Sequence, residues 1–404
     1  MKAREWIGVP EAWAAIEAAI APLGTEEVAV ESAAGRVLRA AVQADRDVPP
    51  FARSAMDGFA VHAADVRHAT EDAQVDLRVI GESTPGLPFS GEVPPGSAVR
   101  IMTGAPLPAD CDCVVPVEES SGFETPRVAI RAAAAPGKNV TPRGRERRAG
   151  DEILPPGRRL DAAGIGALAL VGRARVTVGR RGRVAILSTG NELVALGGTV
   201  GPWQIRNSNG PMLAALAAPF AAATVALGIA GDTLDAIEAA LRRGLESELL
   251  LVTGGVSMGV YDLVGAALER CGVRTHFERL ALQPGKPTVF GTHPGGAVLA
   301  LPGNPVSALT TFRLFGALAL RRLEGESDSR PRWLECPAGF SWERRHAKWL
   351  FLPGVRIPSG GRVALAPYAG SGDLLAYAQA DCQVVLPPDR KRVEPGEPVW
   401  VWPL

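Results

Sequence analysis

From Gly182 to Gly325, segments with two different patterns of hydrophobic residues alternate along the chain. Continuous apolar runs predict strands at RVAILSTG, ATVALGIAG, LLLVTGG and AVLALPGN. Segments with helical spacing follow them, at PMLAALAAPF, LDAIEAALRRGL, LVGAALERCG and VSALTTFRLFGALALRRL. Apolar strands that alternate with amphipathic helices are typical of a doubly wound, mostly parallel sheet. We therefore predict an α/β domain over residues 181–326.

The flanking segments have other patterns. Residues 10–42 have helical spacing, and DAAGIGALALVG from Asp161 returns to it, so residues 1–45 and 142–180 are predicted to form one helical and linker domain. Short β-like runs between Pro/Gly turns predict a β-rich domain over residues 46–141, inserted into the helical one. Similar runs over residues 331–404 predict a C-terminal barrel or sandwich. The predicted fold class is multidomain α/β.

Composition narrows the function. The 404 residues exceed what one hydrophobic core usually organises, and Lys plus Arg equals Asp plus Glu at 43 each. This neutral balance argues against a general nucleic-acid binder. The five cysteines lack metal-site spacing, which predicts reduced thiols. The N-terminus has no secretory pattern, and Pro219 interrupts the uncharged span from Pro211 to Gly231, so we expect a soluble cytoplasmic protein with no membrane segment.

Four glycine-containing loops follow the predicted strands, at the sheet edge where such folds bind ligands. They are STGNEL, AGDT, TGGVSMGVYD and LPGNPVSA. Three of the loops carry an acid, namely Glu192, Asp232 and Asp262. The last two loops offer backbone amides and small polar groups, at Gly254, Gly255, Ser257, Gly303 and Asn304. Amides beside glycine and at helix N-termini favour a phosphate, and the acids tolerate it if Mg²⁺ lies between. Turn glycines and helix caps explain any single loop equally well, but four converging loops favour a site.

Further candidates lie outside these loops. Lys286 stands between two prolines in QPGKPT and is either a surface lysine or a fixed charge for an oxyanion. Asp57 in SAMDGFAV is either part of an Asp-Gly hairpin turn or a functional acid. Thr103 follows a predicted strand in RIMTGAPLP and is a possible anion contact. Ser371 and Gly372 in YAGSGD form either another oxyanion contact or only a hairpin.

Taken together, these motifs resemble a known family. SAMDGFAV, RIMTGAPLP, STGNEL, TGGVSMGVYD, LALQPGKP, LPGNPVSA and GSGD, in this order, are similar to the molybdopterin molybdenumtransferases, which include the C-terminal part of gephyrin. The resemblance spans nearly the whole chain. It implies insertion of molybdate into adenylylated molybdopterin, with release of AMP and a requirement for Mg²⁺. A molybdopterin adenylyltransferase and a non-catalytic scaffold remain the alternatives.

The resemblance also implies roles for individual residues. Asp57, Glu192, Asp232 and Asp262 would be the functional acids, and Lys286, Thr103 and Ser371 would be polar contacts to the substrate or oxyanion. The implied assembly is a homodimer in which the β-rich part of the other subunit helps to close the site. Other enzymes of cofactor synthesis are possible partners. The sequence departs from the family pattern in the oxyanion region, at Thr141, Glu146, Asn191, Thr233 and Gln283, which leaves the choice between molybdate and tungstate open.

Overall fold

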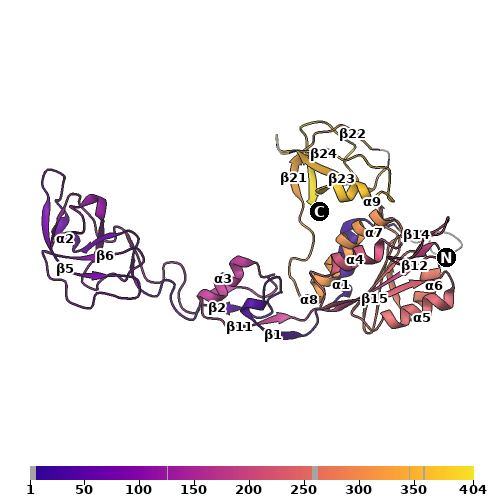
Figure 1. Cartoon of the computed structure of the whole chain (residues 1–404), viewed down its shortest axis with the longest axis horizontal. Helices are drawn as coiled ribbons and strands as arrows, with labels where there is room; N and C mark the ends of the chain where they lie inside the picture. Colours follow the sequence, from indigo (N-terminus) through magenta and orange to yellow (C-terminus); the bar gives the residue numbers. More distant parts are fainter. Residues whose placement is uncertain (1–5, 125, 257–262, 345, 358–359) are drawn as a thin grey trace. The chain divides into compact units, whose positions relative to one another are not determined.

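The structure is a computed structural model that describes residues 6–124, 126–256, 263–344, 346–357 and 360–404. The chain divides into two compact units, and Figure 1 follows it by colour. We call them the α/β unit (Met1–Ala40, Pro156–Ile165 and Arg175–Leu404) and the β-rich unit (Ala41–Pro155 and Gly166–Ala174). Each is described by itself below.

The α/β unit contains the expected sheet. Its six strands run in the order β15 (Ala223–Ala230), β12 (Arg183–Thr189), β16 (Leu249–Thr253), β20 (Gly296–Leu301), β19 (Val289–His293) and β17 (Arg274–Phe277). The first four strands are parallel, and β19 is antiparallel to both of its neighbours. The mostly parallel order therefore agrees with the prediction from the continuous apolar runs.

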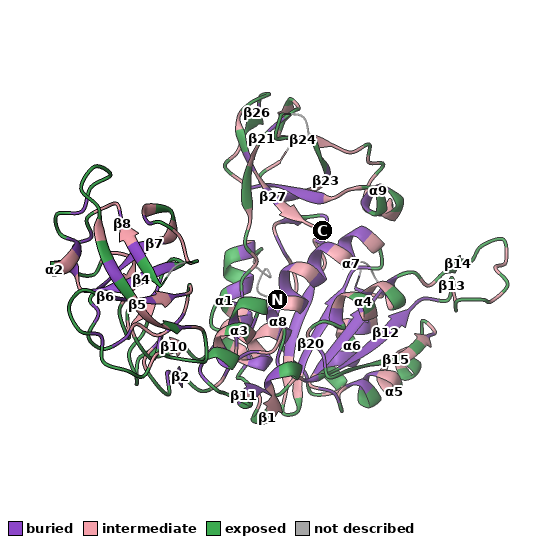
Figure 2. Ribbon diagram, turned by 60° about the vertical axis from the view of Figure 1, so that its left-hand side comes forward, coloured by how far each residue is buried: buried purple, intermediate pink, exposed green. Residues whose placement is uncertain are grey.

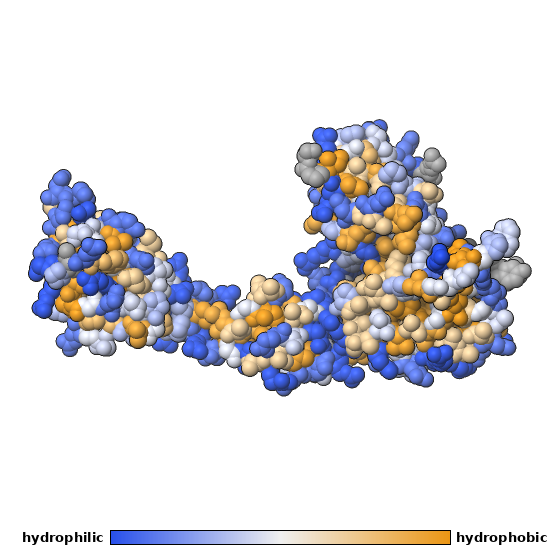
Figure 3. Space-filling view, viewed as in Figure 1, coloured by the Kyte–Doolittle hydropathy of each residue, from blue (hydrophilic) through white to orange (hydrophobic). Residues whose placement is uncertain are grey.

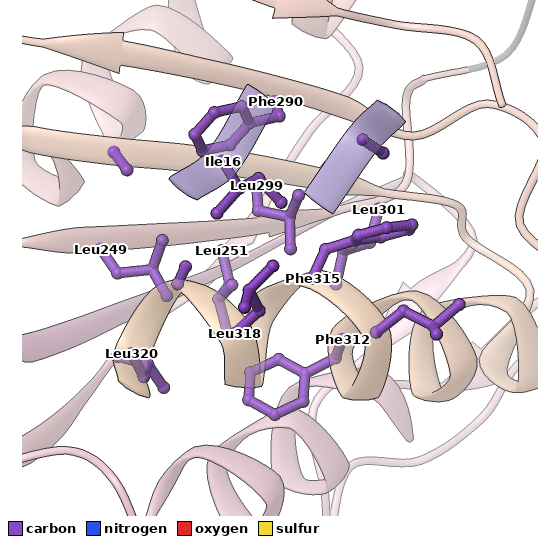
Figure 4. Close-up of a cluster of buried hydrophobic side chains, with 14 of the residues drawn as sticks. Ile16, Leu249, Leu251, Phe290, Leu299, Leu301, Phe312, Phe315, Leu318 and Leu320 are labelled. Atoms are coloured by element: carbon purple, nitrogen blue, oxygen red, sulfur yellow. The ribbon is translucent and has the colours of Figure 1, made fainter. Parts of the chain in front are cut away.

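Helices cover both faces of this sheet, because successive residues of a strand point to opposite sides. Ile186 and Leu251 pack into one core with α4 (Asn209–Ala217) and a long helical segment, whereas Leu187 and Val252 pack into the other core with α5 (Leu234–Gly244) and α6 (Leu263–Arg270). The long segment consists of α7 (Pro305–Thr311), the π-helical η3 (Phe312–Gly316) and α8 (Ala317–Glu324). Figure 4 shows its side chains against those of the sheet.

The N-terminal prediction is partly wrong. The first helix, α1 (Val9–Ala19), ends early, and after Pro22 and Gly24 the chain forms β1 (Thr25–Ala29), which pairs with β11 (Arg175–Gly179), and then the short η1 (Val30–Ser32). Proline and glycine end the helix, since neither continues it cheaply. The α1 helix packs in the α/β core, where the indole N–H of Trp13 donates to the Leu314 carbonyl at 3.1 Å. The predicted helix after Asp161 is present as α3 (Ala162–Leu170).

The C-terminal segment forms a second six-stranded sheet in the same unit. The strand order is β18 (Leu282–Gln283), β23 (Trp349–Ile357), β25 (Cys382–Leu386), β27 (Pro398–Pro403) and β21 (Leu334–Pro337), with β24 (Arg362–Leu365) also on β23. Ala338, which follows β21, bridges Val363 of β24, so the β21 end of this sheet meets the strand that pairs with β23. Smaller elements are β22 (Trp342–Glu343), β26 (Arg392–Val393) and α9 (Leu374–Gln379). Through β18, the QPGKPT segment lies beside this sheet.

The β-rich unit is built on a five-stranded sheet, ordered β7 (Cys113–Pro116), β4 (Gly58–Val61), β6 (Ser97–Ile101), β5 (Val75–Ser83) and β8 (Arg127–Ile130). The predicted β-like runs are all present. Short pairs join β2 (Val42–Gln43) to β10 (Glu152–Leu154) and β3 (Arg53–Ser54) to β9 (Val140–Thr141), and α2 is Ala63–Val66. Buried strand residues are purple in Figure 2. Within the part of the chain that the structure describes, no helix has the length and apolar character needed to cross a membrane.

Candidate active site

A cavity of about 1050 Å³ lies at the carboxyl edge of the parallel strands in the α/β unit. Residues that follow β12, β15, β16 and β20 all line it, so the expected convergence of the four loops is present. Seven of the predicted site residues are among its lining: Glu192, Asp232, Gly254, Gly255, Gly303, Asn304 and Gly372. Two others, Ser257 and Asp262, lie outside the described residues.

The loop after β16 needs its two glycines. Gly254 and Gly255 have φ angles of +95° and +67°, in the region that side-chain-bearing residues rarely adopt. A Cβ on Gly254 would lie 2.4 Å from the Thr189 carbonyl oxygen, and one on Gly255 would lie 2.6 Å from a methyl carbon of Val264. The glycines therefore allow the loop to pass close to β12 and α6, which leaves its backbone along the cavity.

The two described acids belong to loops that are joined to each other. The Asn191 N–H donates to the Asp232 carboxylate at 3.0 Å, and the Asp232 N–H donates to the Asn191 side-chain oxygen at 3.1 Å. Thr233 caps α5, because its hydroxyl accepts a hydrogen bond from the Ala236 N–H at 3.3 Å. Two departures from the family pattern, Asn191 and Thr233, thus have structural roles here. Glu192 is also exposed on this rim.

The donor set suits Mg²⁺ in part. Carboxylate oxygens are the ligands that Mg²⁺ prefers, and the ion is usually bound by one or two carboxylates together with substrate phosphates. Glu192 and Asp232 supply two carboxylates at one cavity. Among the residues that the structure describes, no group of three or more acidic, His or Cys side chains is arranged to hold a metal, so substrate oxygens would have to complete the coordination of an ion bound here.

The opposite side of the cavity favours an anion. Asn209 and Pro305 begin α4 and the long helical segment that starts with α7, and both residues line the cavity. Helix N-termini carry partial positive charge. At these two helices the charge has to act largely without free N–H groups, because the Gly210 N–H donates to the Asn207 side-chain oxygen at 3.0 Å and the Val306 N–H donates to the Ser371 carbonyl at 3.1 Å. The Asn304 amide donates to the Ser371 hydroxyl at 2.7 Å, so the predicted GSGD loop lies beside LPGNPVSA. The cavity therefore suits a phosphate near the starts of α4 and α7 and a cation near Glu192 and Asp232.

Sequence reasoning missed the segment from Arg206 to Asn209. Within the described lining, Arg206 is the only Lys or Arg side chain. The Asn209 amide nitrogen donates to the Thr253 hydroxyl and to the Gly303 carbonyl, both at 2.8 Å, which leaves its buried oxygen without a partner among the described residues. The preceding strand β14 (Ile205–Arg206) has only two residues and no apolar run. The polar run RNSNG before a helix was the available signal.

Comparisons with known proteins match this chain along its length. Three family models match it: "MoeA N-terminal region (domain I and II)" over residues 7–172, "Probable molybdopterin binding domain" over 185–322, and "MoeA C-terminal region (domain IV)" over 336–404. A protein of Mycobacterium tuberculosis named molybdopterin molybdenumtransferase 2 is 35% identical over 383 residues, which cover 93% of this chain and 94% of that protein. The chain belongs to the molybdopterin molybdenumtransferase family.

Other members of the family support this assignment. The molybdopterin molybdenumtransferase of Nostoc sp. is 34% identical over 388 residues, covering 94% of this chain and 89% of that one. The crystal structure of a molybdopterin biosynthesis MoeA protein from Pyrococcus horikoshii is 29% identical, covers 99% of both chains and has a TM-score of 0.76. The resemblance inferred from the motifs is therefore confirmed, and so is the multidomain α/β fold.

Lys286, a site residue predicted from the family motifs, is not among the residues that line the cavity. The Lys286 ammonium lies over the Trp6 ring, 4.7 Å from its centroid, and the Lys348 ammonium lies 5.6 Å from the same ring. Both distances are within cation–π range. Pro287, the next residue, does line the cavity. Lys286 is thus placed close to the rim, and its role toward an oxyanion stays a prediction.

Asp57 and Thr103 come together in the β-rich unit. The Thr103 N–H and hydroxyl both donate to one Asp57 oxygen, at 2.6 and 2.7 Å, and these hydrogen bonds lower the pKa of Asp57. The hairpin alternative is wrong: β3 and β4, on either side of Asp57, pair with other strands. Gly58 serves close packing instead, because a Cβ there would lie 2.0 Å from the Val115 carbonyl oxygen. An exposed carboxylate held in its charged form results.

Proposed function

We propose that this protein is a transferase of molybdenum cofactor biosynthesis that inserts molybdenum into molybdopterin, the activity for which its relatives are named. The single observation that carries the proposal is the glycine-walled cavity with Glu192 and Asp232 at its rim, in a chain that matches these enzymes over nearly all of its length. In finer detail, we propose that the substrate is adenylylated molybdopterin and that AMP leaves.

The cavity residues suggest how this reaction would be supported. The loop at Gly254 and Gly255 and the positive ends of α4 and of the helical segment that starts with α7 would bind the phosphate groups. Glu192 and Asp232, with Asp262, would hold Mg²⁺, which supplies positive charge to the phosphate as AMP leaves. Molybdate is a substrate and a tetrahedral dianion, so Lys286 and Arg206 would attract it electrostatically. We assign polar substrate contacts to Thr103, Ser257, Gly303, Asn304, Ser371 and Gly372, and an acidic role to Asp57.

The proposed assembly is a homodimer. One supporting feature is the edge strand β15, in which apolar residues are exposed; Val225, for example, is 41% exposed. Figure 3 shows apolar surface on this part of the α/β unit. Natural proteins seldom leave such edges uncovered.

A second structural proposal concerns the C-terminal sheet. The bridge between Ala338 and Val363 supports our proposal that this sheet is barrel-like.

One experiment tests the proposed function. Purified protein is incubated with adenylylated molybdopterin, Mg²⁺ and either molybdate, tungstate or no oxyanion, and AMP is measured by chromatography. We expect AMP release that depends on both the oxyanion and Mg²⁺, and a product that activates a molybdenum apoenzyme. A second reaction contains molybdopterin and ATP without molybdate. Formation of adenylylated molybdopterin in that reaction would favour the adenylyltransferase alternative, and inactivity in both would favour a scaffold.

A further inference from the structure

A protruding arm with an exposed tryptophan stands beside the cavity. It comprises residues 195–204, between β13 (Leu193–Val194) and β14. Trp203 exposes 91% of its surface, and Leu196, on the same arm, exposes 65%. Figure 2 shows the arm projecting beyond β13 and β14. Tryptophan is on average a largely buried residue, so an indole this exposed suggests that a ligand or partner covers it.

The base of the arm is part of the cavity wall. Leu193, Ile205 and Arg206 line the cavity. The Ile205 N–H donates to the Glu192 carbonyl at 2.8 Å, and the Asn207 N–H donates to the Val194 carbonyl at 2.9 Å, so both ends of the arm are fixed to the loop that carries Glu192. Trp203 precedes Ile205 by two residues, and two residues span at most about 7 Å of chain. The indole is therefore attached within reach of the cavity rim.

We propose that Trp203 stacks on a flat nitrogen heterocycle of the bound substrate. This inference rests on the proposed function, which provides a ligand with phosphate in its middle and an aromatic ring at each end. If the phosphates lie at the glycine loop and helix N-termini, a ring extends from them toward the rim. An indole offers a large flat surface, and stacking of aromatic side chains on bases is favourable whatever the base. Trp203 is thus a residue that determines affinity and specificity for the substrate.

The first test compares Trp203→Ala, Trp203→Phe and Leu196→Ala. Loss of one stacked ring typically weakens binding by roughly 5- to 150-fold, so we expect the Ala variant to raise KM for adenylylated molybdopterin by that factor, with kcat within twofold of wild type. The Phe variant keeps a ring and should recover most of the affinity. Leu196→Ala removes the other exposed apolar side chain of the arm, which has no flat ring, and should behave as wild type. An unchanged KM for Trp203→Ala would overturn the proposal.

Direct binding distinguishes the two rings. The dissociation constants of AMP, molybdopterin and ribose 5-phosphate are measured by calorimetry for wild type and Trp203→Ala. A selective loss for AMP identifies the adenine, a selective loss for molybdopterin identifies the pterin, and ribose 5-phosphate, which has no ring, should bind both proteins equally. If each ligand binds Trp203→Ala as tightly as it binds wild type, the proposal is wrong and the indole contacts solvent. If binding is unchanged but the oligomeric state of the variant differs, the indole contacts another copy of the chain. If wild type releases no AMP while the selective loss persists, the proposed function fails but the stacking stands.

Discussion

At the residue scale, the candidate acids of each unit are held in place by neighbouring polar groups. Asn191 and Asp232 exchange two hydrogen bonds between neighbouring loops, and Thr103 directs two donors at Asp57. Removing a donor or acceptor from such a pair therefore changes the position or charge of an acid, as well as its local stability. Conservative substitutions separate these two effects.

We predict that Asn191→Ala impairs the use of Mg²⁺. The substitution removes the acceptor for the Asp232 N–H, so the loop carrying the carboxylate is held less firmly, at a cost of about 0.5–1.5 kcal/mol of stability. The Mg²⁺ concentration for half-maximal AMP release should rise several-fold. Asn191→Asp is the matched control, because it keeps an acceptor and adds a carboxylate, and it should not raise the Mg²⁺ requirement. A wild-type Mg²⁺ titration for Asn191→Ala would count against Asp232 as a ligand.

Asp57→Asn should cost far more activity than stability. An Asn side-chain oxygen can still accept both hydrogen bonds from Thr103, so we expect the melting temperature to change little. The charge is lost, and a functional acid in general acid–base or charge-stabilising chemistry contributes roughly 100-fold or more to the rate. Melting curves and AMP release measured on the same preparation provide the test. Near-normal turnover would restrict Asp57 to a local structural role.

The direction of the Asp57 pKa adds a pH prediction. A lowered folded-state pKa means that this carboxylate stabilises the protein above its unfolded-state pKa and loses that contribution as pH falls through the lower, folded value. Asp57 therefore remains charged throughout the weakly acidic range. If the kcat/KM of wild type falls between about pH 7 and pH 5, Asp57 is not the group that titrates. The same acidic limb of the pH profile should then be seen in the residual activity of Asp57→Asn. Disappearance of that limb in the variant would assign it to Asp57.

At the scale of elements, the geometry of the cavity follows from turns that only glycine fits. Gly254 combines a positive φ with close backbone approach to Thr189, whereas Gly197 has a φ of +82° and nothing within 4 Å of the place where its Cβ would be. The two positions therefore separate conformational strain from steric overlap.

Gly254→Ala should destabilise the protein more than Gly197→Ala does. The φ angle alone costs about 1–2 kcal/mol for a residue with a Cβ. At Gly254 the Cβ would also lie 2.4 Å from the Thr189 carbonyl oxygen, so we expect a total of about 2–4 kcal/mol and weaker AMP binding. Urea unfolding followed by fluorescence gives the free energy of unfolding of both variants. Equal losses for the two variants would mean that the loop shifts without resistance from β12.

Elements also show what the sequence could predict. The parallel strands were identified because strands buried on both faces form continuous apolar runs, and their loops followed from the topology. The strand β1 was missed, since TEEVA carries too few apolar residues to show a period. The segment from Arg206 to Asn209 was missed because it joins the site through a two-residue strand. The roles of Asn191 and Gly58 depend on contacts with distant segments, which no local pattern reveals.

At the scale of the whole molecule, one buried carboxylate of the α/β unit pairs with arginines on the segments that connect this unit to the β-rich unit. Glu324, at the end of α8, is fully buried and lies 3.2 Å from Arg36, 2.9 Å from Arg159 and 3.2 Å from Arg181. Arg36 precedes the point where the chain leaves this unit, and Arg159 follows its return. Both crossing segments are thus anchored by one carboxylate, and a buried charge of this kind must stay paired to be tolerated.

The two units should therefore unfold separately. Phe59 is fully buried in the core of the β-rich unit, and Phe290 is fully buried in that of the α/β unit. Replacing either by Ala removes about 3–5 kcal/mol from its own core. We expect two calorimetric transitions in wild type, with Phe59→Ala lowering one and Phe290→Ala lowering the other. AMP binding should survive Phe59→Ala at temperatures below the remaining transition, because the loops that we propose to bind phosphate belong to the α/β unit. If both substitutions lower a single shared transition, the units are one cooperative structure, and the activity of any variant in the β-rich unit has to be interpreted through the stability of the whole chain.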